Sequence, residues 1–343
     1  MRVLVIGGTG FVGAAAVRRL AAAGHAVAVY HRGRTAAALP PAVQTLHGDR
    51  LDLPQRRSEL ERFQPDAVLD TCAYTEHEAA PAIEALRGIA ARAVVLSSGD
   101  VYRAYDRLRS GAGPVEPVPL SESAPLRTSR YPYRAHAEPG TRLHEYDKVL
   151  VEAAYRAAPP LTLTVLRLPA VYGPGDPQHR LYPLLRRMDD GRPAILLEEG
   201  QDVWRWTRGY VENVAAAIAL AVADERAAGR TYNLGEAEAR TERAWVEAVG
   251  EAAGWSGAVV AVPGDGLPAP LRQPLDWRQD LVLDTGRIRA ELGYAEPVGR
   301  AEALRRTVAW ARAHPPPDRA AFDYAAEDAA LRAAPRRPRQ SES

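Results

Sequence analysis

Several features are scarce in this sequence of 343 residues. It has one cysteine, Cys72, so it cannot form an internal disulfide framework, and we expect a protein of the reducing cytoplasm. It contains no run of about 18 apolar residues, the minimum for a membrane-spanning helix. Its 44 basic and 43 acidic side chains nearly cancel, which argues against a global field that would attract nucleic acid or an anionic membrane.

What is present is an alternation of short apolar runs with helix-forming stretches. It predicts right-handed crossovers and a doubly wound, parallel α/β (Rossmann) sheet. The predicted strands are 3–6, 26–30, 43–47, 67–70, 93–97 and 161–168, and the predicted helices are 11–23, 54–63, 76–90 and 145–158.

We therefore predict three regions. Residues 1–170 form a dinucleotide-binding domain, interrupted by an irregular insertion at 103–143 that holds six prolines. Residues 171–314 form a smaller α+β substrate lobe, with helices near 214–223 and 243–253 and a strand at 230–234. Residues 315–343 form a helix and a disordered tail.

A glycine-rich turn lies between the first strand and the first helix. In Gly7-Gly-Thr9-Gly10-Phe11-Val12-Gly13, Gly7 can make the tight turn, Gly10 lets the backbone approach a pyrophosphate, and Gly13 lets the helix pack closely. The helix N-terminus then attracts the anion. Because the turn lies directly between the first strand and the first helix, it strongly indicates a dinucleotide site. Thr9, Phe11 and Val12 belong to the same predicted site.

The end of the second strand bears on which dinucleotide is bound. An acid there would accept hydrogen bonds from the 2′-hydroxyl of NAD, but this strand ends in His31, Arg32, Gly33 and Arg34. Arginines can neutralise a 2′-phosphate, which favours NADP over NAD. The alternative is that both arginines are solvated and NAD binds.

Two further residues are assigned to the cofactor site. Asp49 is placed to contact adenine, or it is a turn aspartate. Cys72 follows a strand end, although it also fits as a small buried hydrophobe.

Later motifs resemble the extended or atypical short-chain dehydrogenase/reductase superfamily, which includes the NAD-dependent epimerase/dehydratase family. They are Ser97-Ser98-Gly99-Asp100-Val101-Tyr102, Leu166-Arg-Leu-Pro169-Ala-Val-Tyr-Gly-Pro174, Tyr232-Asn-Leu-Gly235 and Asp284 to Tyr294, and the resemblance covers about residues 1–313. It implies a nicotinamide cofactor, a substrate-orienting Ser98, a ribose-holding Lys148, and Pro169 beside the cofactor.

The stretch HEYDKVLVE, residues 144–152, departs from the family pattern. The family places its tyrosine four residues before the lysine, where both share a helix face, but here that position holds His144. Three interpretations compete. His144 carries the proton, which we take as the leading one; or the helix starts late and Tyr146 turns inward; or the tyrosine function is lost.

The remaining candidates concern the substrate. Asp100 occupies one of two acidic positions used by dehydratase-like relatives, so it is a possible second acid or base, or a solvated aspartate. Arg134, Arg205 and Arg278 are candidate substrate ligands. The insertion also holds Arg127, Arg130, Arg142, Tyr131 and Tyr133, which could clamp phosphates and stack on a ring.

The sequence thus predicts an NAD(P)-dependent epimerase, dehydratase or reductase acting on a nucleotide-activated sugar or a similar polyhydroxylated substrate. The alternative is a protein of the same fold that binds a dinucleotide or RNA without redox turnover, although nucleic acid as a partner is disfavoured and no metal site is expected. The resemblance also implies a homodimer formed through the helices near 76–90 and 145–158.

Overall fold

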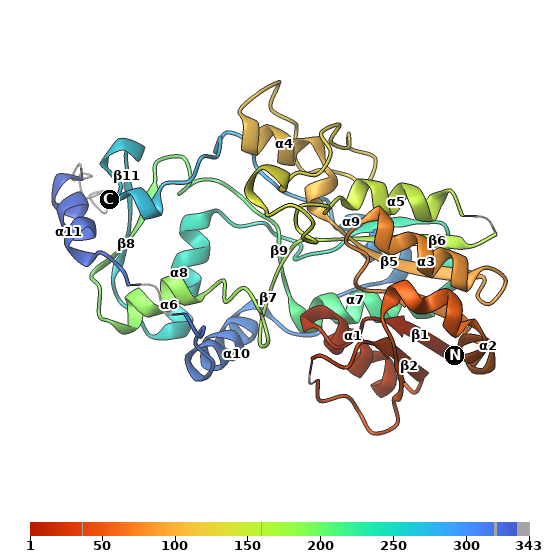
Figure 1. Cartoon of the computed structure of the whole chain (residues 1–343). Helices are drawn as coiled ribbons and strands as arrows, with labels where there is room; N and C mark the ends of the chain where they lie inside the picture. The colour runs from red at the N-terminus through yellow and green to blue at the C-terminus, as the bar shows by residue number, and fades with distance from the viewer. Residues whose placement is uncertain (36, 159, 319–320, 335–343) are drawn as a thin grey trace.

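A computed structural model describes residues 1–35, 37–158, 160–318 and 321–334. Its centre is a seven-stranded, fully parallel sheet in the order β10-β6-β5-β4-β1-β2-β3 (Figure 1). The strands are β1 (Arg2–Ile6), β2 (Ala26–His31), β3 (Gln44–His47), β4 (Ala67–Asp70), β5 (Arg92–Ser98), β6 (Thr162–Leu168) and β10 (Thr231–Asn233). The predicted doubly wound α/β fold is confirmed.

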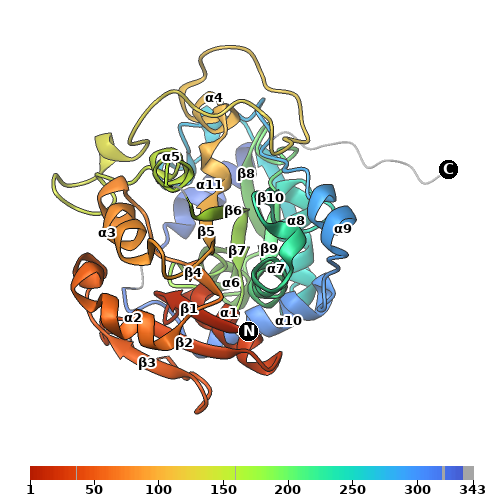
Figure 2. The ribbon, with the colours of Figure 1, turned by 90° about the vertical axis from the view of Figure 1, so that its right-hand side faces the viewer.

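Helices cover both faces of this sheet (Figure 2). On one face α1 (Phe11–Ala22) packs against α7 (Val211–Ala223), and on the other α3 (Glu76–Leu86) packs against α5 (Lys148–Arg156) and the 3₁₀ segment η1 (Arg50–Arg56). Helix α2 (Arg57–Phe63) follows η1. Because both faces are covered, the inner strands are apolar along their whole length: Val3 to Ile6 have no exposed surface.

A smaller lobe lies beyond the sheet, at the left of Figure 1. It contains two-stranded parallel sheets, β8 with β11 and β7 with β9. Its elements are β7 (Ala170–Tyr172), α6 (Tyr182–Asp189), β8 (Ala194–Glu198), β9 (Arg208–Tyr210), α8 (Glu242–Ala253), β11 (Ala258–Val262), α10 (Arg300–Ala313) and α11 (Tyr324–Ala333). Helix α9 (Gly286–Leu292) returns to contact β10 and α7.

The structure differs from the sequence prediction in three places. The strand expected at 230–234 and the helix expected near 214–223 do not belong to the second lobe. They are β10, the edge strand of the main sheet beside β6, and α7, which packs on the same sheet against α1. The insertion is not wholly irregular, since it begins with helix α4 (Arg103–Ser110) and contains the 3₁₀ turn η3 (Arg134–His136). Helix α5 begins at Lys148, three residues later than expected.

Two predictions concern the end of the chain and the absence of a membrane span. The predicted helix after Pro317 is present as α11, whereas the predicted disordered tail, 334–343, lies outside the described residues except for Ala334. Among the residues that the structure describes, no helix is long and apolar enough to cross a membrane.

Candidate active site

A cavity of about 1510 Å³ opens at the carboxyl ends of the parallel strands. This edge of a doubly wound sheet is where such folds bind ligands. Its walls come from the glycine-rich turn, the ends of β2, β4 and β5, the insertion, and Trp206, Leu281 and Leu283 of the second lobe. All five predicted catalytic residues except His144 line it, as do all predicted cofactor residues.

The glycine-rich turn has the geometry that a pyrophosphate requires. Gly7 has φ +98°, and a Cβ there would lie 2.3 Å from the Thr71 hydroxyl oxygen, so only glycine fits. A Cβ on Gly13 would lie 3.0 Å from Gly8 Cα, which explains the close contact of α1 with the turn. Around Gly10 a Cβ would meet nothing within 4 Å, so this backbone borders open cavity at the start of α1.

The end of β2 presents basic groups to the same cavity. Arg32 and Arg34 are exposed, line the cavity, and form no ion pair with any acid in the described parts of the chain. His31 Nδ1 accepts a hydrogen bond from Gly33 N at 3.1 Å, which orders the turn that carries them. Opposite, Asp49 lines the cavity but also caps η1 by accepting from Leu51 N at 3.1 Å.

Cys72 lies in the cavity wall above a buried ion pair. Arg50 Nη2 contacts Asp70 Oδ2 at 2.7 Å, and Arg50 Nη1 lies 3.2 Å from Cys72 Sγ. Burial raises the pKa of the Cys72 thiol to about 11. The thiol therefore stays protonated at neutral pH, and it is a packing group beside the cofactor site rather than a nucleophile.

The late start of α5 has a clear physical cause. Asp147 is the N-cap of this helix and accepts from Val149 N at 2.9 Å and Leu150 N at 3.3 Å. The other side of its carboxylate is held by Arg127 of the insertion, with contacts of 2.7 and 3.1 Å, and both side chains are fully buried. Residues before Asp147 therefore follow the insertion rather than the helix.

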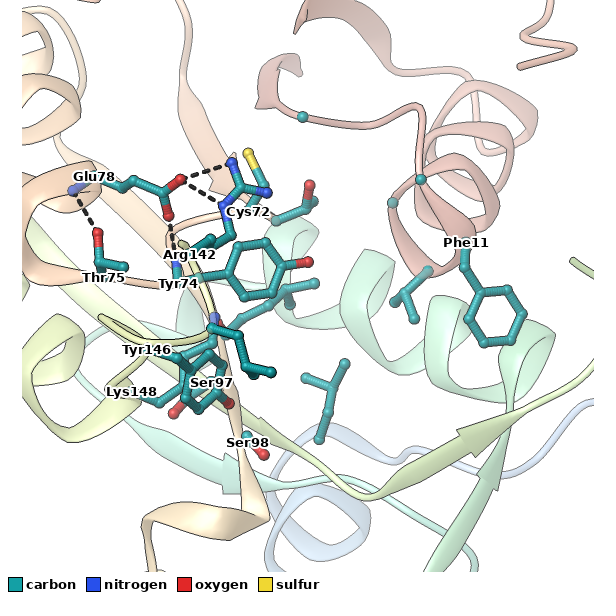
Figure 3. A pocket seen from close by; sticks show the side chains of 18 of the residues that line it. Phe11, Cys72, Tyr74, Thr75, Glu78, Ser97, Ser98, Arg142, Tyr146 and Lys148 are labelled. Carbon is teal, nitrogen blue, oxygen red and sulfur yellow. Dashed lines mark hydrogen bonds and ion pairs between the residues drawn. The ribbon is translucent and has the colours of Figure 1, made fainter. Parts of the chain in front are cut away.

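This entry turn points Tyr146 into the cavity. Its hydroxyl donates to Asp100 Oδ2 at 2.8 Å. Figure 3 shows Tyr146, Lys148 and Ser98 gathered at the end of β5. Ser98 Oγ accepts from Asp100 N at 3.2 Å, so the serine and the aspartate are held in one tight turn. Burial, followed by the charge of Asp100, raises the pKa of Tyr146 well above its ordinary value.

Lys148 is buried beneath this group. Its ammonium donates to Ala73 O at 2.6 Å and to Leu96 O at 2.8 Å, which leaves one of its three N–H donors for a ligand. It is the only lysine in the chain, since the other 43 basic side chains are arginines. A single lysine among so many arginines marks this position in the sequence as a candidate site residue, independently of the family motif. A compact ammonium fits this site, whereas a planar guanidinium would not.

His144 lies elsewhere. Its ring Nδ1 contacts Glu145 Oε1 at 2.6 Å, in the turn that precedes α5, and the histidine is not among the cavity-lining residues. Of the three interpretations of HEYDKVLVE, the geometry fits a helix that starts late with Tyr146 turned inward. The leading expectation, His144 as proton carrier, has no support from this arrangement.

The three candidate substrate arginines also lie outside the large cavity. Arg134 contacts Glu145 at 2.9 Å, Arg205 contacts Asp280 at 2.7 Å, and Arg278 contacts Asp276 at 2.5 Å. Arg278 lines a separate cavity of about 620 Å³. The partner of Arg205 is 75 residues away and could not be foreseen from the sequence, whereas Asp276 stands only two residues before Arg278.

Arg142 of the insertion does line the cavity. It contacts Glu78 of α3 at 2.7 Å, and its guanidinium lies 5.0 Å from the centre of the Tyr74 ring (Figure 3). Arg127, the other notable arginine of the insertion, is buried in its pair with Asp147 and has a structural role.

The sequence is similar to those of known nicotinamide-dependent enzymes. Residues 3–235 match the NAD dependent epimerase/dehydratase family. A 2′-dehydrokanamycin reductase from Streptomyces kanamyceticus is 33% identical over 272 residues, which cover 77% of this chain and 70% of the relative. A dTDP-glucose 4,6-dehydratase from Streptomyces griseus is 30% identical over 203 residues, which cover 59% of this chain and 56% of the relative.

Solved structures show the same fold. The UDP-glucose 4-epimerase of Thermus thermophilus, in complex with NAD, has a TM-score of 0.64 and 25% identity, covering 91% of this chain and 99% of that one. The cradle around Gly7 and Gly10 fits a nicotinamide dinucleotide. The chain therefore belongs to the NAD dependent epimerase/dehydratase family and is a nicotinamide-dependent enzyme of the epimerase, dehydratase and reductase class.

Proposed function

We propose that this enzyme reduces a ketone of a polyhydroxylated, glycoside-type substrate to the alcohol with NADPH, and that Tyr146 supplies the proton. The observation that carries the proposal is the Tyr146 hydroxyl, which reaches the cavity at the end of β5 beside Ser98. The family relative named 2′-dehydrokanamycin reductase supports a reduction over an epimerisation or a dehydration.

Each residue has a distinct part. The cofactor, when bound, supplies the hydride. Ser98 orients the carbonyl oxygen by a hydrogen bond, and Tyr146 donates its phenolic proton to the same oxygen as negative charge develops there. Lys148 offers its remaining N–H to a ribose hydroxyl, and its positive charge favours the tyrosinate that is left behind.

The preference for NADPH rests on the end of β2. Arg32 and Arg34 are free of acidic partners within the described residues and face the cavity where a ribose 2′-phosphate would lie. No acid ends β2 to accept from a 2′-hydroxyl, since His31 is its last residue.

The substrate is proposed to lack a nucleoside diphosphate. A diphosphate needs unpaired cations, and the other arginines that line the cavity are already paired. These pairs are Arg50 with Asp70, Arg142 with Glu78 and Arg180 with Asp176. The cavity wall also carries the aromatic side chains of Tyr74, Tyr131 and Trp206, which suit the faces of sugar rings.

The test is consumption of NADPH with a panel of ketones. The panel holds 2′-dehydrokanamycin, simple keto sugars, and a 4-keto sugar joined to a nucleoside diphosphate as the diphosphate comparison. We expect NADPH to be oxidised with a keto glycoside and not with the nucleotide-bound keto sugar. Interconversion of a sugar nucleotide without net loss of NADPH would instead identify an epimerase and overturn the proposal.

A matched pair of variants tests the proton donor. Tyr146→Phe keeps the ring and removes only the hydroxyl, so kcat should fall about 10²–10⁴-fold. His144→Ala removes a partly exposed contact with Glu145 and should leave kcat near that of the wild type. The reverse pattern in two folded variants would return the role to His144.

A further inference from the structure

Asp100 lines the cavity, but it is largely buried and its carboxylate is held by its own neighbours. Its Oδ2 atom accepts two phenolic hydrogen bonds, from Tyr146 at 2.8 Å and from Tyr133 at 3.1 Å. Its Oδ1 atom is buried and has no partner in the described chain. Neither oxygen is therefore free to act directly on a substrate, and whatever Asp100 does must pass through a tyrosine.

The second tyrosine continues the chain of hydroxyls. Tyr133 of the insertion lies 2.9 Å, oxygen to oxygen, from Tyr105 of helix α4. The Tyr133 ring packs edge-on against Tyr146, with 5.2 Å between ring centres. Tyr105 and Tyr133 are both only partly buried. A continuous row thus runs from Tyr146 through Asp100 and Tyr133 to Tyr105.

We propose that Asp100, Tyr133 and Tyr105 form a proton relay that restores the proton which Tyr146 gives to the substrate. The inference rests on the proposed function and deepens it. In the reduction, hydride goes to the carbonyl carbon and the Tyr146 proton goes to its oxygen. The tyrosinate then takes a proton from Asp100, which is refilled from solvent through Tyr105 and Tyr133. One proton is consumed per ketone reduced.

The charges around Asp100 suit a group that gains and loses a proton. Burial raises its pKa, while the hydroxyls of Tyr146 and Tyr133 and the positive charges of Arg127 and Lys148 lower it. These opposing effects bring the acid and the carboxylate closer in energy than in an exposed aspartate. Because Oδ1 lacks a partner within the described residues, the carboxylate is left incompletely stabilised, which also favours uptake of a proton.

Lys148 does not replace this relay. Two of its N–H groups are given to Ala73 O and Leu96 O, and within the described structure it makes no hydrogen bond to Tyr146 or Asp100. The insertion therefore takes part in the proposed proton transfer. Its residues Tyr105 and Tyr133 connect the proton donor to the outside, and both act as positioning residues because neither needs to touch the substrate.

The first arm of the test needs no substrate. Infrared difference spectra of the NADPH-bound protein are recorded against pH, and the carboxylic acid band of Asp100 is assigned by its loss in Asp100→Asn. Tyr133→Phe should shift the midpoint of this band to higher pH, because the carboxylate loses one hydrogen bond. Tyr324→Phe, which removes a hydroxyl bonded to Asp190 in the second lobe, should not.

The second arm uses the ketone that is turned over in the panel. With Tyr133→Phe or Tyr105→Phe we expect kcat to fall roughly tenfold, the rate effect of about 1.4 kcal/mol, with KM unchanged. The solvent deuterium isotope effect on kcat should rise, since resupply of the proton becomes slow. A purely structural role would lower kcat without changing this isotope effect.

The outcomes separate the two proposals. An unshifted Asp100 band in folded Tyr133→Phe overturns the relay, whether or not a ketone is reduced. A shifted band with an isotope effect equal to that of the wild type overturns it as well. Failure of every ketone to consume NADPH overturns the proposed function alone, because the band shift still decides whether Tyr133 and Asp100 share a proton. If Tyr133→Phe does not fold, Tyr105→Phe is measured with the ketone, and a solvent isotope effect equal to that of the wild type overturns the relay.

Discussion

The ionisation of Lys148 can be predicted from its surroundings. The side chain is 4% exposed, and burial lowers its pKa from the ordinary value of 10.5 to about 8. The negative charges of Asp70 and Asp100 oppose this change, whereas the charge of Arg50 adds to it. The shift corresponds to about 3 kcal/mol of lost preference for the charged form. At neutral pH the lysine remains mostly charged, as its proposed role requires.

The measurement benefits from the composition of the chain. Because Lys148 is the only lysine, incorporating carbon-13 at the lysine Cε position gives a single side-chain resonance, and its shift against pH reports one residue. We expect a midpoint near 8 in the folded protein. Asp100→Asn should lower the midpoint further, because one negative charge is lost. A wild-type midpoint near 10.5 would show a solvated ammonium and refute the argument from burial.

The same shift has a consequence for stability. In the unfolded chain the lysine keeps its proton up to about pH 10.4, whereas in the folded protein it loses it above about pH 8. Between these values the unfolded state binds more protons, so the contribution of Lys148 to the free energy of unfolding rises with pH. The difference between wild type and Lys148→Met, measured by urea unfolding at several pH values, isolates this contribution.

Three further predictions concern the cofactor and assembly. Gly10→Ala should fold normally, because its Cβ meets nothing within 4 Å, but it should bind NADPH more weakly. Gly7→Ala should instead lower the melting temperature, because its Cβ lies 2.3 Å from Thr71. Equal NADPH binding by Gly10→Ala and the wild type would contradict the assignment of the glycine-rich turn to the pyrophosphate. Replacing Arg32 and Arg34 by alanine should weaken NADPH binding by about 1.5–3 kcal/mol per lost charged contact and leave NADH binding nearly unchanged. Both affinities are measured by fluorescence titration. Equal losses of NADPH and NADH affinity would show that neither arginine contacts a 2′-phosphate. The homodimer through α3 and α5 remains a prediction. Sedimentation of the wild type should give twice the monomer mass, and a monomer mass would refute it.

The sheet and the glycine-rich turn could be predicted because their causes are local. A strand buried on both faces is apolar along its length, as Val3 to Ile6 are, and a turn that needs positive φ selects glycine, as at Gly7. These requirements are written in consecutive residues. The six predicted strands from 3–6 to 161–168 are therefore all present, within about two residues of their predicted bounds.

The position of the proposed proton donor could not be predicted in this way. Whether Tyr146 or His144 faces the cavity depends on where α5 begins, and this depends on Asp147 meeting Arg127, twenty residues earlier in the chain. Helical spacing alone assumes that the helix already includes position 144. Likewise, β10 joins the main sheet through pairing with β6, a contact between distant segments that no local pattern reveals.

The buried pair of Arg127 and Asp147 bears on protein engineering and on how related chains are found by sequence search. Breaking such a pair from one side leaves an uncompensated charge and typically costs about 3–5 kcal/mol. The insertion and the start of α5 can therefore be grafted into another member of the family only together. A search for tyrosine four residues before lysine passes over chains built in this manner, whereas a search for an arginine in the insertion and an aspartate directly before the lysine would collect them.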